Sequence, residues 1–225
     1  MARSSSWRVM VAVLAISAGS GPATAAEAAA APHDSRESSL EVVAEQASRD
    51  ARLVMHWVRH AADAQGQPFA VVDKKAAQIY VFDRNGRLAG SAPALIGQAF
   101  GDSTAPGVGD MPPATIPVAL RTTPAGRFAS QPGHNLKGEA LVWVDYAAAV
   151  AIHRLRPAAP AERRPQRLAS PSPEDNRISL GCVVVDELFY DAVVAPTLGR
   201  ERGVVYVLPE QTDVPRWLAA YAQAL

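Results

Sequence analysis

The pattern of apolar and polar positions begins with one stretch of helical periodicity. Between Leu40 and Ala64, apolar residues recur every three or four positions, and charged residues stand between them. This spacing predicts an amphipathic helix, which Gly66 and Pro68 bring to an end. The apolar stripe is about as wide as that of an ordinary packed helix, so we expect the helix to lie against the rest of the protein.

After Pro68 the apolar residues follow a period of two, which is typical of strands. Residues 69–73 and 78–82 each form such a run. The pair Asn85-Gly86 is a strong hairpin signal, and residues 87–95 continue as a third strand. We therefore expect a group of hairpin-linked strands directly after the helix.

The rest of the chain alternates short apolar runs with polar or Gly- and Pro-rich segments. In chain order we expect a loop over residues 97–113, a short extended piece over 116–120, a turn over 122–128 leading into a strand, an apolar strand over 141–152, a polar segment over 154–176, a helix over 186–198, a strand over 204–208 and a closing helix over 214–225 with Trp217, Leu218 and Tyr221 facing in. Many short strands with few helices predict a mostly β fold with flanking helices, a β-sandwich or barrel preceded by the amphipathic helix.

The first 25 residues have the organisation of a secretory signal peptide. Arg3 and Arg8 precede an apolar run of about ten residues, and small residues at Ala23-Thr24-Ala25 offer a cleavage site. That run is too short to cross a bilayer, which takes roughly 20 residues. The sequence thus predicts a signal over residues 1–25, a leader and helix over 26–66, and one domain over 67–225. The alternatives for the apolar run are an uncleaved anchor and an ordinary buried helix.

A cleaved signal implies export across the inner membrane to the periplasm or cell wall, without a stable membrane span afterwards. The chain has 22 basic and 22 acidic residues, so its net charge indicates no nucleic-acid or membrane-surface partner. Hydrophobic residues make up 48% of the 225 residues, which is enough for a packed core. The oligomeric state stays open.

The chain has one cysteine, Cys182, although exported proteins normally use cysteines in pairs as disulfides. A single cysteine is an inert buried residue, an intermolecular link or a reactive thiol. His56 and His60 have helical i, i+4 spacing, but without a carboxylate cluster this favours a solvated helix face over a metal site. One cysteine and scattered histidines provide no metal ligand set, and we expect no cofactor.

His153 is the histidine best placed to act as a base for the thiol. It ends an apolar strand, so the sheet fixes its position, and a thiol becomes a nucleophile when a neighbouring base takes its proton. Gly181 permits a tight turn, after which the amides of Gly181 and Cys182 are candidates to face a developing oxyanion. The alternative is an inert thiol in the core and a core histidine bonded to the backbone.

Five stretches together carry a resemblance to a known family. They are Ile152-His153, Ser179-Leu180-Gly181-Cys182-Val183, the segment QIYVFDRNGRL, residues 121–128 (RTTPAGRF) and residues 203–207 (GVVYV). Their order resembles that of the L,D-transpeptidase (YkuD-type) catalytic domain, over about residues 69–209. The resemblance implies that fold, with residues 67–225 as the catalytic domain.

The resemblance also implies a mechanism. Cys182 is then the nucleophile and His153 the base, the backbone carbonyl of Arg154 orients the imidazole, and Ser179 and Gly181 form the motif turn. The substrates are peptidoglycan stem peptides: the bond before the terminal D-alanine of a tetrapeptide is cut, and the acyl group passes through a thioester to an amine in a 3→3 crosslink or a protein attachment. Transfer to water instead gives an L,D-carboxypeptidase. A non-catalytic domain that binds cell-wall peptide is the third possibility.

The chain departs from the family at three places. Leu180 stands where many members have a second histidine, and Val184 stands where many have an arginine that holds a substrate carboxylate. The third departure is an insert at residues 154–177 that is rich in arginine and proline. It is either a solvated surface segment or a lid whose arginines meet the carboxylates of the stem peptide.

Overall fold

The computed structural model describes residues 42–223. The predicted signal peptide, most of the leader and Leu40 lie outside the described residues. Between residues 42 and 223, no helix combines the length and the apolar character needed to span a membrane.

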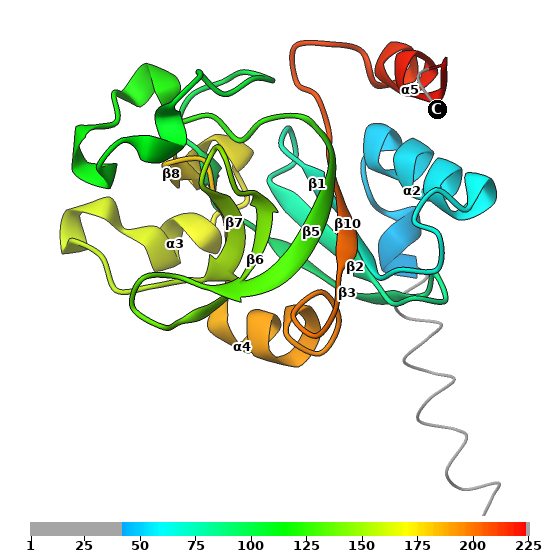
Figure 1. The fold of residues 1–225 in the computed structure, drawn as a ribbon, viewed down its shortest axis with the longest axis horizontal. Coiled ribbons are helices and arrows are strands. Elements are labelled where there is room, and N and C mark those ends of the chain that lie inside the picture. Colours follow the sequence, from blue (N-terminus) through cyan, green and yellow to red (C-terminus); the bar gives the residue numbers. More distant parts are fainter. Residues whose placement is uncertain (1–41, 224–225) are drawn as a thin grey trace, which may run out of the picture.

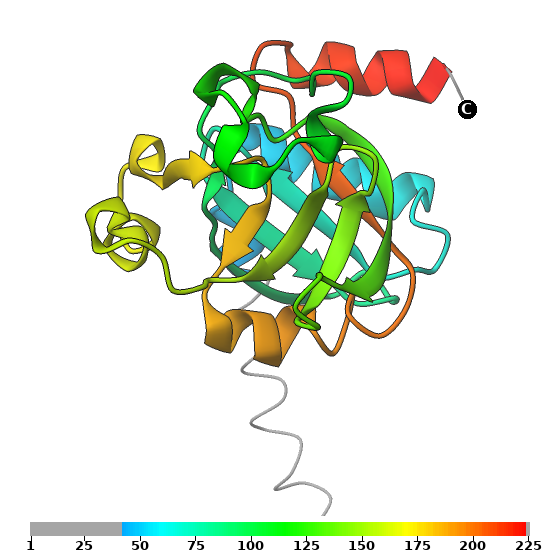
Figure 2. The same cartoon turned by 60° about the vertical axis from the view of Figure 1, so that its left-hand side comes forward.

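Most strands belong to one strongly curved sheet (Figures 1 and 2). The strands are β1 (Phe69–Asp73), β2 (Gln78–Phe82), β3 (Leu88–Pro93), β4 (Ile96–Gly97), β5 (Gly126–His134), β6 (Ala140–Asp145), β7 (Val150–Arg154), β8 (Arg177–Ser179), β9 (Val183–Val185) and β10 (Gly203–Val207). The large sheet has the order β3-β2-β1-β10-β5-β6-β7-β9, and β4 pairs with β8 in a separate small sheet. Neighbouring strands are antiparallel except for the pairs β1–β10, β7–β9 and β4–β8.

The two edges of the large sheet meet, so that the sheet is nearly closed. Leu95, just after β3, and Val184 of β9 exchange two backbone hydrogen bonds of 2.8 Å each. Side chains from the inner face of the sheet, among them Ile79, Ile152 and Val205, form one core cluster inside this barrel. The expected fold class, mostly β with flanking helices, is confirmed in its barrel form.

Helices cover the outside and one end of the barrel (Figure 1). They are α2 (Arg49–Ala61), α3 (Arg164–Leu168), α4 (Glu187–Phe189) continued by the π-helical turn Tyr190–Val194, and α5 (Val214–Gln223), with 3₁₀ turns at Val108–Asp110, Pro113–Thr115, Val118–Leu120, Pro160–Glu162 and Pro173–Asn176. A second core cluster joins α2 and α5 to the outer face of β1, β2 and β10. Leu218 is buried in this cluster, and the rings of Tyr221 and Trp57 contact edge to face with 5.7 Å between their centroids. The side chains of Leu218 and Tyr221 both face inward, as expected for the closing helix.

The first helix is shorter than the sequence predicts. Residues 42–45 are helical, but the helix then breaks and α2 begins after Ser48. The Ser48 hydroxyl accepts a hydrogen bond from the N–H of Ala51 at 3.0 Å, which is the contact of an N-cap residue. At the other end Ala62 takes the left-handed conformation (φ 51°), so the helix stops before Gly66.

Two further expectations are wrong in detail. The apolar run over 141–152 is not one strand but the hairpin of β6 and β7. The Asp145 carboxylate accepts a hydrogen bond from the N–H of Ala148, and Ala149 has φ 54°, so the chain turns back between the strands. Residues 116–120 are not extended: Val118–Leu120 is a 3₁₀ turn that follows Pro117.

Candidate active site

His153 and Cys182 lie on the same face of two neighbouring strands. In the parallel pair β7–β9, Ile152 is opposite Val183 and His153 is opposite Val184. The side chains of these strands that face the barrel interior are Val150, Ile152, Val183 and Val185. Because side chains alternate along a strand, His153 and Cys182 both point to the outer face, on adjacent strands and offset by two positions.

The imidazole of His153 is held in one orientation and stays neutral. It is 8% exposed, and its Nδ1 lies 2.7 Å from the carbonyl oxygen of Arg154. A carbonyl only accepts, so Nδ1 carries the proton and Nε2 keeps a free lone pair. Burial lowers the pKa of His153 to about 4; the Arg154 carbonyl opposes this, and the charges of Arg156 and Arg164 add to it.

The thiol of Cys182 is half-buried and hydrogen-bonded to the backbone. Its Sγ–H donates to the carbonyl oxygen of Ala149 at 3.5 Å. Burial raises the pKa of Cys182, against the opposing effects of the Ala151 N–H and the positive charge of Arg156. The resting site therefore contains a neutral thiol and a neutral imidazole, and the thiol must rotate away from Ala149 before His153 can take its proton.

Ser179 closes the turn that presents the cysteine. Its hydroxyl donates to the carbonyl of Cys182 at 2.6 Å and accepts from the N–H of Gly181 at 3.1 Å. Gly181 has φ 131°, and a Cβ there would come within 2.8 Å of the Thr122 carbonyl oxygen. Only glycine fits this turn without strain. The Gly181 amide donates to Ser179, so it would have to leave this hydrogen bond to face an oxyanion.

The side chain of Thr123 is hydrogen-bonded to the turn that carries Cys182. It is 1% exposed, and its hydroxyl donates to the carbonyl of Gly181 and accepts from the N–H of Gly97, each at 2.8 Å. Its own carbonyl accepts a hydrogen bond of 3.0 Å from the Lys74 ammonium. The sequence placed Thr123 in a turn but gave no sign that its hydroxyl contacts the cysteine motif.

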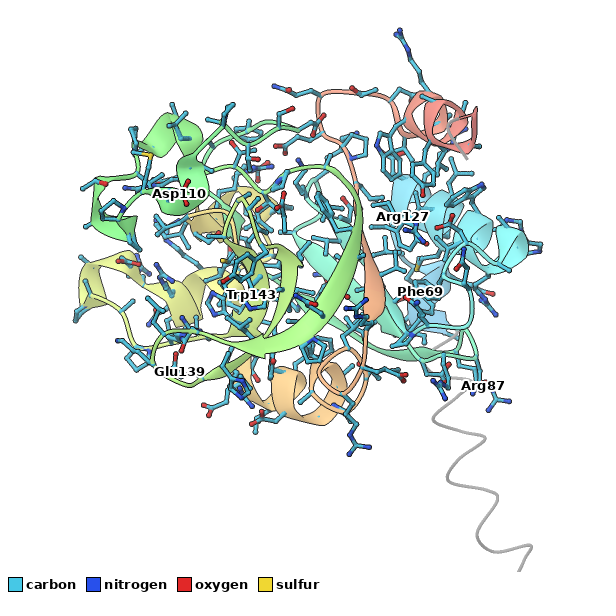
Figure 3. All side chains as sticks on the ribbon, viewed as in Figure 1. Phe69, Arg87, Asp110, Arg127, Glu139 and Trp143 are labelled. Carbon is cyan, nitrogen blue, oxygen red and sulfur yellow. The ribbon has the colours of Figure 1, made fainter. Side chains whose placement is uncertain are left out.

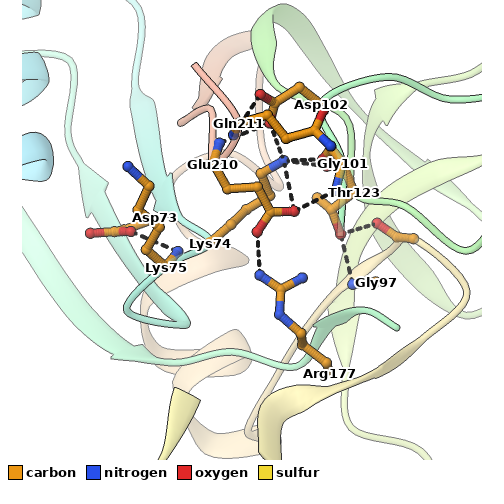
Figure 4. A network of polar contacts seen from close by, with 11 residues as sticks. Asp73, Lys74, Lys75, Gly97, Gly101, Asp102, Thr123, Arg177, Glu210 and Gln211 are labelled. Carbon is orange, nitrogen blue, oxygen red and sulfur yellow. Dashed lines mark hydrogen bonds and ion pairs between the residues drawn. The ribbon is translucent and has the colours of Figure 1, made fainter. Parts of the chain in front are cut away.

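Lys74 is the centre of a buried network of charges (Figure 4). Its Nζ donates to the carbonyl of Gly101 at 2.5 Å and to the carboxylate of Asp102 at 2.9 Å. Glu210 lies 3.7 Å from the same ammonium and also pairs with Arg177, at the start of β8. The network ties the long loop after β4 to the segment that leads into the cysteine turn.

Arg154 contributes its backbone rather than its charge. The guanidinium points away from the imidazole, with Nε donating to Asp191 at 2.7 Å and the group stacked 4.2 Å from the centroid of the Tyr190 ring. The carbonyl is the atom that contacts His153.

The insert at residues 154–177 contacts the barrel beside this site. Leu168 of α3 is buried against Leu95 and Val184, in a small cluster that also includes Cys182 and Leu155. The part around α3 stands out from the barrel (Figure 2). Its residues line an open cavity of about 400 Å³. The insert is thus anchored through an apolar contact and is not solvated throughout.

An aromatic pair lies on the same outer face. Trp143 of β6 is opposite Ala151 of β7, and Ala151 lies between Trp143 and Cys182. The ring of Tyr146 contacts the ring of Trp143 edge to face, with 4.9 Å between their centroids. Trp143 and Glu139 are on the side of the barrel that bears the insert (Figure 3). No motif or spacing in the sequence singles out this pair. Among the residues that the structure describes, no three His, Cys, Asp or Glu side chains gather as a metal site requires.

Comparison with known proteins found no matching family model and no matching curated protein. Solved structures do match. The L,D-transpeptidase LdtMt1 in complex with imipenem is 19% identical over 63% of this chain and 58% of its own, with a TM-score of 0.34. The catalytic domain of the E. faecium L,D-transpeptidase is 16% identical over 64% of this chain and 98% of its own, with a TM-score of 0.35.

The helical cell shape determining protein Pgp2 from Campylobacter jejuni is 13% identical over 65% of this chain, with a TM-score of 0.42. The match covers 49% of Pgp2, so this chain corresponds to about half of that protein. Because these TM-scores lie below 0.5 and these identities below 20%, we assign neither a family nor an activity to the chain from them.

Proposed function

We propose that the protein is a cysteine acyltransferase of the L,D-transpeptidase type that acts on peptidoglycan stem peptides. The observation that carries the proposal is the arrangement of Cys182 and His153 on one face of adjacent strands, with His153 Nδ1 bonded to a carbonyl and Nε2 free to accept a proton. The order of motifs in the sequence supports the substrate class.

The first half of the reaction forms a thioester. The Cys182 thiol turns from Ala149 toward His153, Nε2 accepts its proton, and sulfur attacks the carbonyl carbon before the terminal D-alanine. The Cys182 amide is the candidate donor to the oxyanion, since the Gly181 amide is occupied. As the C–N bond breaks, the imidazolium returns its proton to the leaving amine, and D-alanine departs.

The second half transfers the acyl group. An amine on a second stem peptide or a protein attacks the thioester carbonyl while His153 accepts the proton that the amine loses. The C–S bond breaks, and the proton returns from His153 to sulfur, which restores the thiol. Attack by water in the same position gives hydrolysis, so the acceptor alone separates a transpeptidase from an L,D-carboxypeptidase.

Intact-protein mass spectrometry tests the proposal. The chain from residue 26 onward is mixed with a purified tetrapeptide stem, with and without an amine acceptor. We expect an adduct on Cys182, released D-alanine and, with the acceptor, a crosslinked product. Tripeptide without crosslinked product would identify the carboxypeptidase, whereas neither adduct nor D-alanine with several acyl donors would favour a domain that only binds peptide.

Matched variants separate the chemistry from the fold. Cys182→Ala should give no adduct, and His153→Gln should slow adduct formation by roughly 100- to 10,000-fold, the usual contribution of a general base. His134→Gln, at the exposed end of β5, makes the same change two strands away in the sheet and should react like the wild type. Equal rates for the two glutamine variants would exclude His153 as the base.

We also propose that the protein is exported and that residues 1–25 are removed. The intact mass of the protein secreted from cells that express the full chain should correspond to cleavage after Ala25 or Ala26. A retained chain of full-length mass would contradict export through a cleaved signal.

A further inference from the structure

The cavity in the insert is built from one segment of the chain that begins two residues after His153. Its walls come from residues 155–166, and three of them are arginines: Arg156, Arg163 and Arg164. Leu155, two positions beyond His153, lines the cavity and also packs in the cluster that includes Cys182. Leu155 therefore links the cavity to the cluster that includes Cys182.

The charges at this cavity do not balance. Arg156 pairs with Glu139 at 3.0 Å, and Arg164 pairs with Glu162 at 2.5 Å. Among the described residues, the exposed side chain of Arg163 has neither an ion pair nor a hydrogen bond. The cavity thus has three arginines but only two carboxylate partners. One guanidinium group is free to bind an anion from a ligand. Arginine suits a carboxylate because its planar group donates two parallel hydrogen bonds.

The proposed reaction places a carboxylate on this side of the thiol. His153 must protonate the nitrogen of the leaving D-alanine, so that nitrogen lies next to the imidazole in the transition state. The carboxylate of the same residue is only two bonds further away. Leu155, which lines the cavity, also packs in the cluster that includes Cys182, and Arg156 is the next residue in the chain, so this proposal puts the cavity arginines on the side of the thiol from which the leaving group departs.

We propose that the arginine-lined cavity of the insert binds the terminal carboxylate of the residue that leaves the acyl donor. This inference rests on the proposed function and names the part of the protein that selects for a free C-terminus. Val184, the residue two positions after the cysteine, is fully buried and has no charge that could bind a carboxylate.

Binding to Cys182→Ala protein tests the inference without requiring turnover. The probes are two synthetic tetrapeptide stems that differ only at the terminal D-alanine, one with a free carboxylate and one with a carboxamide. Calorimetry should give roughly 10- to 100-fold tighter binding of the acid, the range expected for one charged hydrogen-bonded contact. In the Arg163→Gln, Arg164→Gln double variant, this preference should fall to about one.

Two further variants control for a loss of binding that is caused by misfolding. Arg163→Gln alone breaks no contact of the described chain and should remove part of the preference. Arg200→Gln, an exposed arginine in the turn before β10, makes the same change of charge elsewhere and should leave the preference intact. A preference that survives in the double variant, or no preference in the parent, would overturn the inference.

Thioester formation by the wild-type protein, followed with the same two peptides, distinguishes this inference from the proposed function. A preference for the acid that depends on Arg163 and Arg164, without any thioester, would support the carboxylate site and contradict the acyltransferase. Thioester formation at equal rates from acid and amide would support the acyltransferase and contradict the carboxylate site.

Discussion

Replacing Thr123 with valine removes one hydroxyl group from beneath the cysteine turn and changes little else. The two side chains have nearly the same shape, so the variant leaves no large cavity. The hydroxyl, however, serves two backbone groups: it donates to the carbonyl of Gly181 and accepts from the N–H of Gly97, both at 2.8 Å. Thr123, Gly97 and Gly181 are all buried, so water cannot replace the lost partner.

The expected cost follows from these two groups. A buried backbone group left without a partner costs about 1–3 kcal/mol, so the Thr123→Val variant, which strands two such groups, should lose roughly 2–6 kcal/mol of unfolding free energy. That is a large part of the 5–15 kcal/mol that typically stabilises a domain. For a domain of this size, where 1 kcal/mol shifts Tm by about 2–4 °C, it corresponds to a drop in Tm of roughly 4–24 °C.

Urea unfolding followed by tryptophan fluorescence measures the loss, with Thr197→Val as the matched control. The Thr197 hydroxyl only donates, to the carbonyls of Val193 at 2.6 Å and Val194 at 3.2 Å, and Thr197 is partly exposed. We expect that control to lose less than about 1 kcal/mol. A Thr123→Val variant within about 0.5 kcal/mol of the wild type would refute the view that this hydroxyl holds the cysteine turn.

Three further predictions concern single groups near the site. Gly181→Ala should lose about 1–3 kcal/mol in urea unfolding, because its Cβ would lie 2.8 Å from the Thr122 carbonyl oxygen at φ 131°. Lys74→Met should cost about 3–5 kcal/mol at pH 7 by leaving the Asp102 carboxylate without its cation, and less at pH 4, where the carboxylates begin to protonate; an equal loss at both pH values would contradict this. The pKa of His153 is lowered to about 4 in the folded protein, so as the pH falls the imidazole is protonated in the unfolded chain before it is protonated in the folded one. The free energy of unfolding of the wild type should therefore fall by up to about 3 kcal/mol between pH 6.5 and pH 4. The His153→Gln variant should not show this part of the pH dependence.

Local patterns predicted the elements whose signal lies in their own residues. The strands at 69–73 and 78–82 match the structure residue for residue, because short apolar runs there are bounded by turn-forming segments. The turn between β6 and β7 was missed because its determinants, the Asp145 side chain and the left-handed Ala149, leave the apolar composition of the run unchanged. The break at Ser48 was overlooked because the apolar spacing continues across it, although serine is a common N-cap.

Some features of the candidate site could also be predicted from adjacent residues, and others could not. The position of His153 at a strand end and that of Cys182 after Gly181 could be read from adjacent residues. The role of Lys74 could not, since lysine is rarely buried and its acceptors come from segments distant in sequence. Only the folded chain brings such acceptors together around one ammonium.

The carboxylate site and the base are coupled through charge. Burial lowers the pKa of His153 most and the Arg154 carbonyl raises it; the charges of Arg156 and Arg164 lower it further, and Glu139 raises it. An anionic ligand in the arginine-lined cavity would cancel part of the effect of Arg156 and Arg164, so the imidazole becomes a stronger base when the donor is bound.

Nuclear magnetic resonance titration of His153 in Cys182→Ala protein should therefore give a higher pKa with the free-acid tetrapeptide than without ligand. The carboxamide peptide covers the same surface without the charge, and any desolvation that it adds would lower the pKa of His153. Equal shifts with acid and amide would mean that the arginines act on the imidazole without sensing the substrate. A shift with the acid alone would mean that the protein strengthens its base only when a cleavable donor is in place.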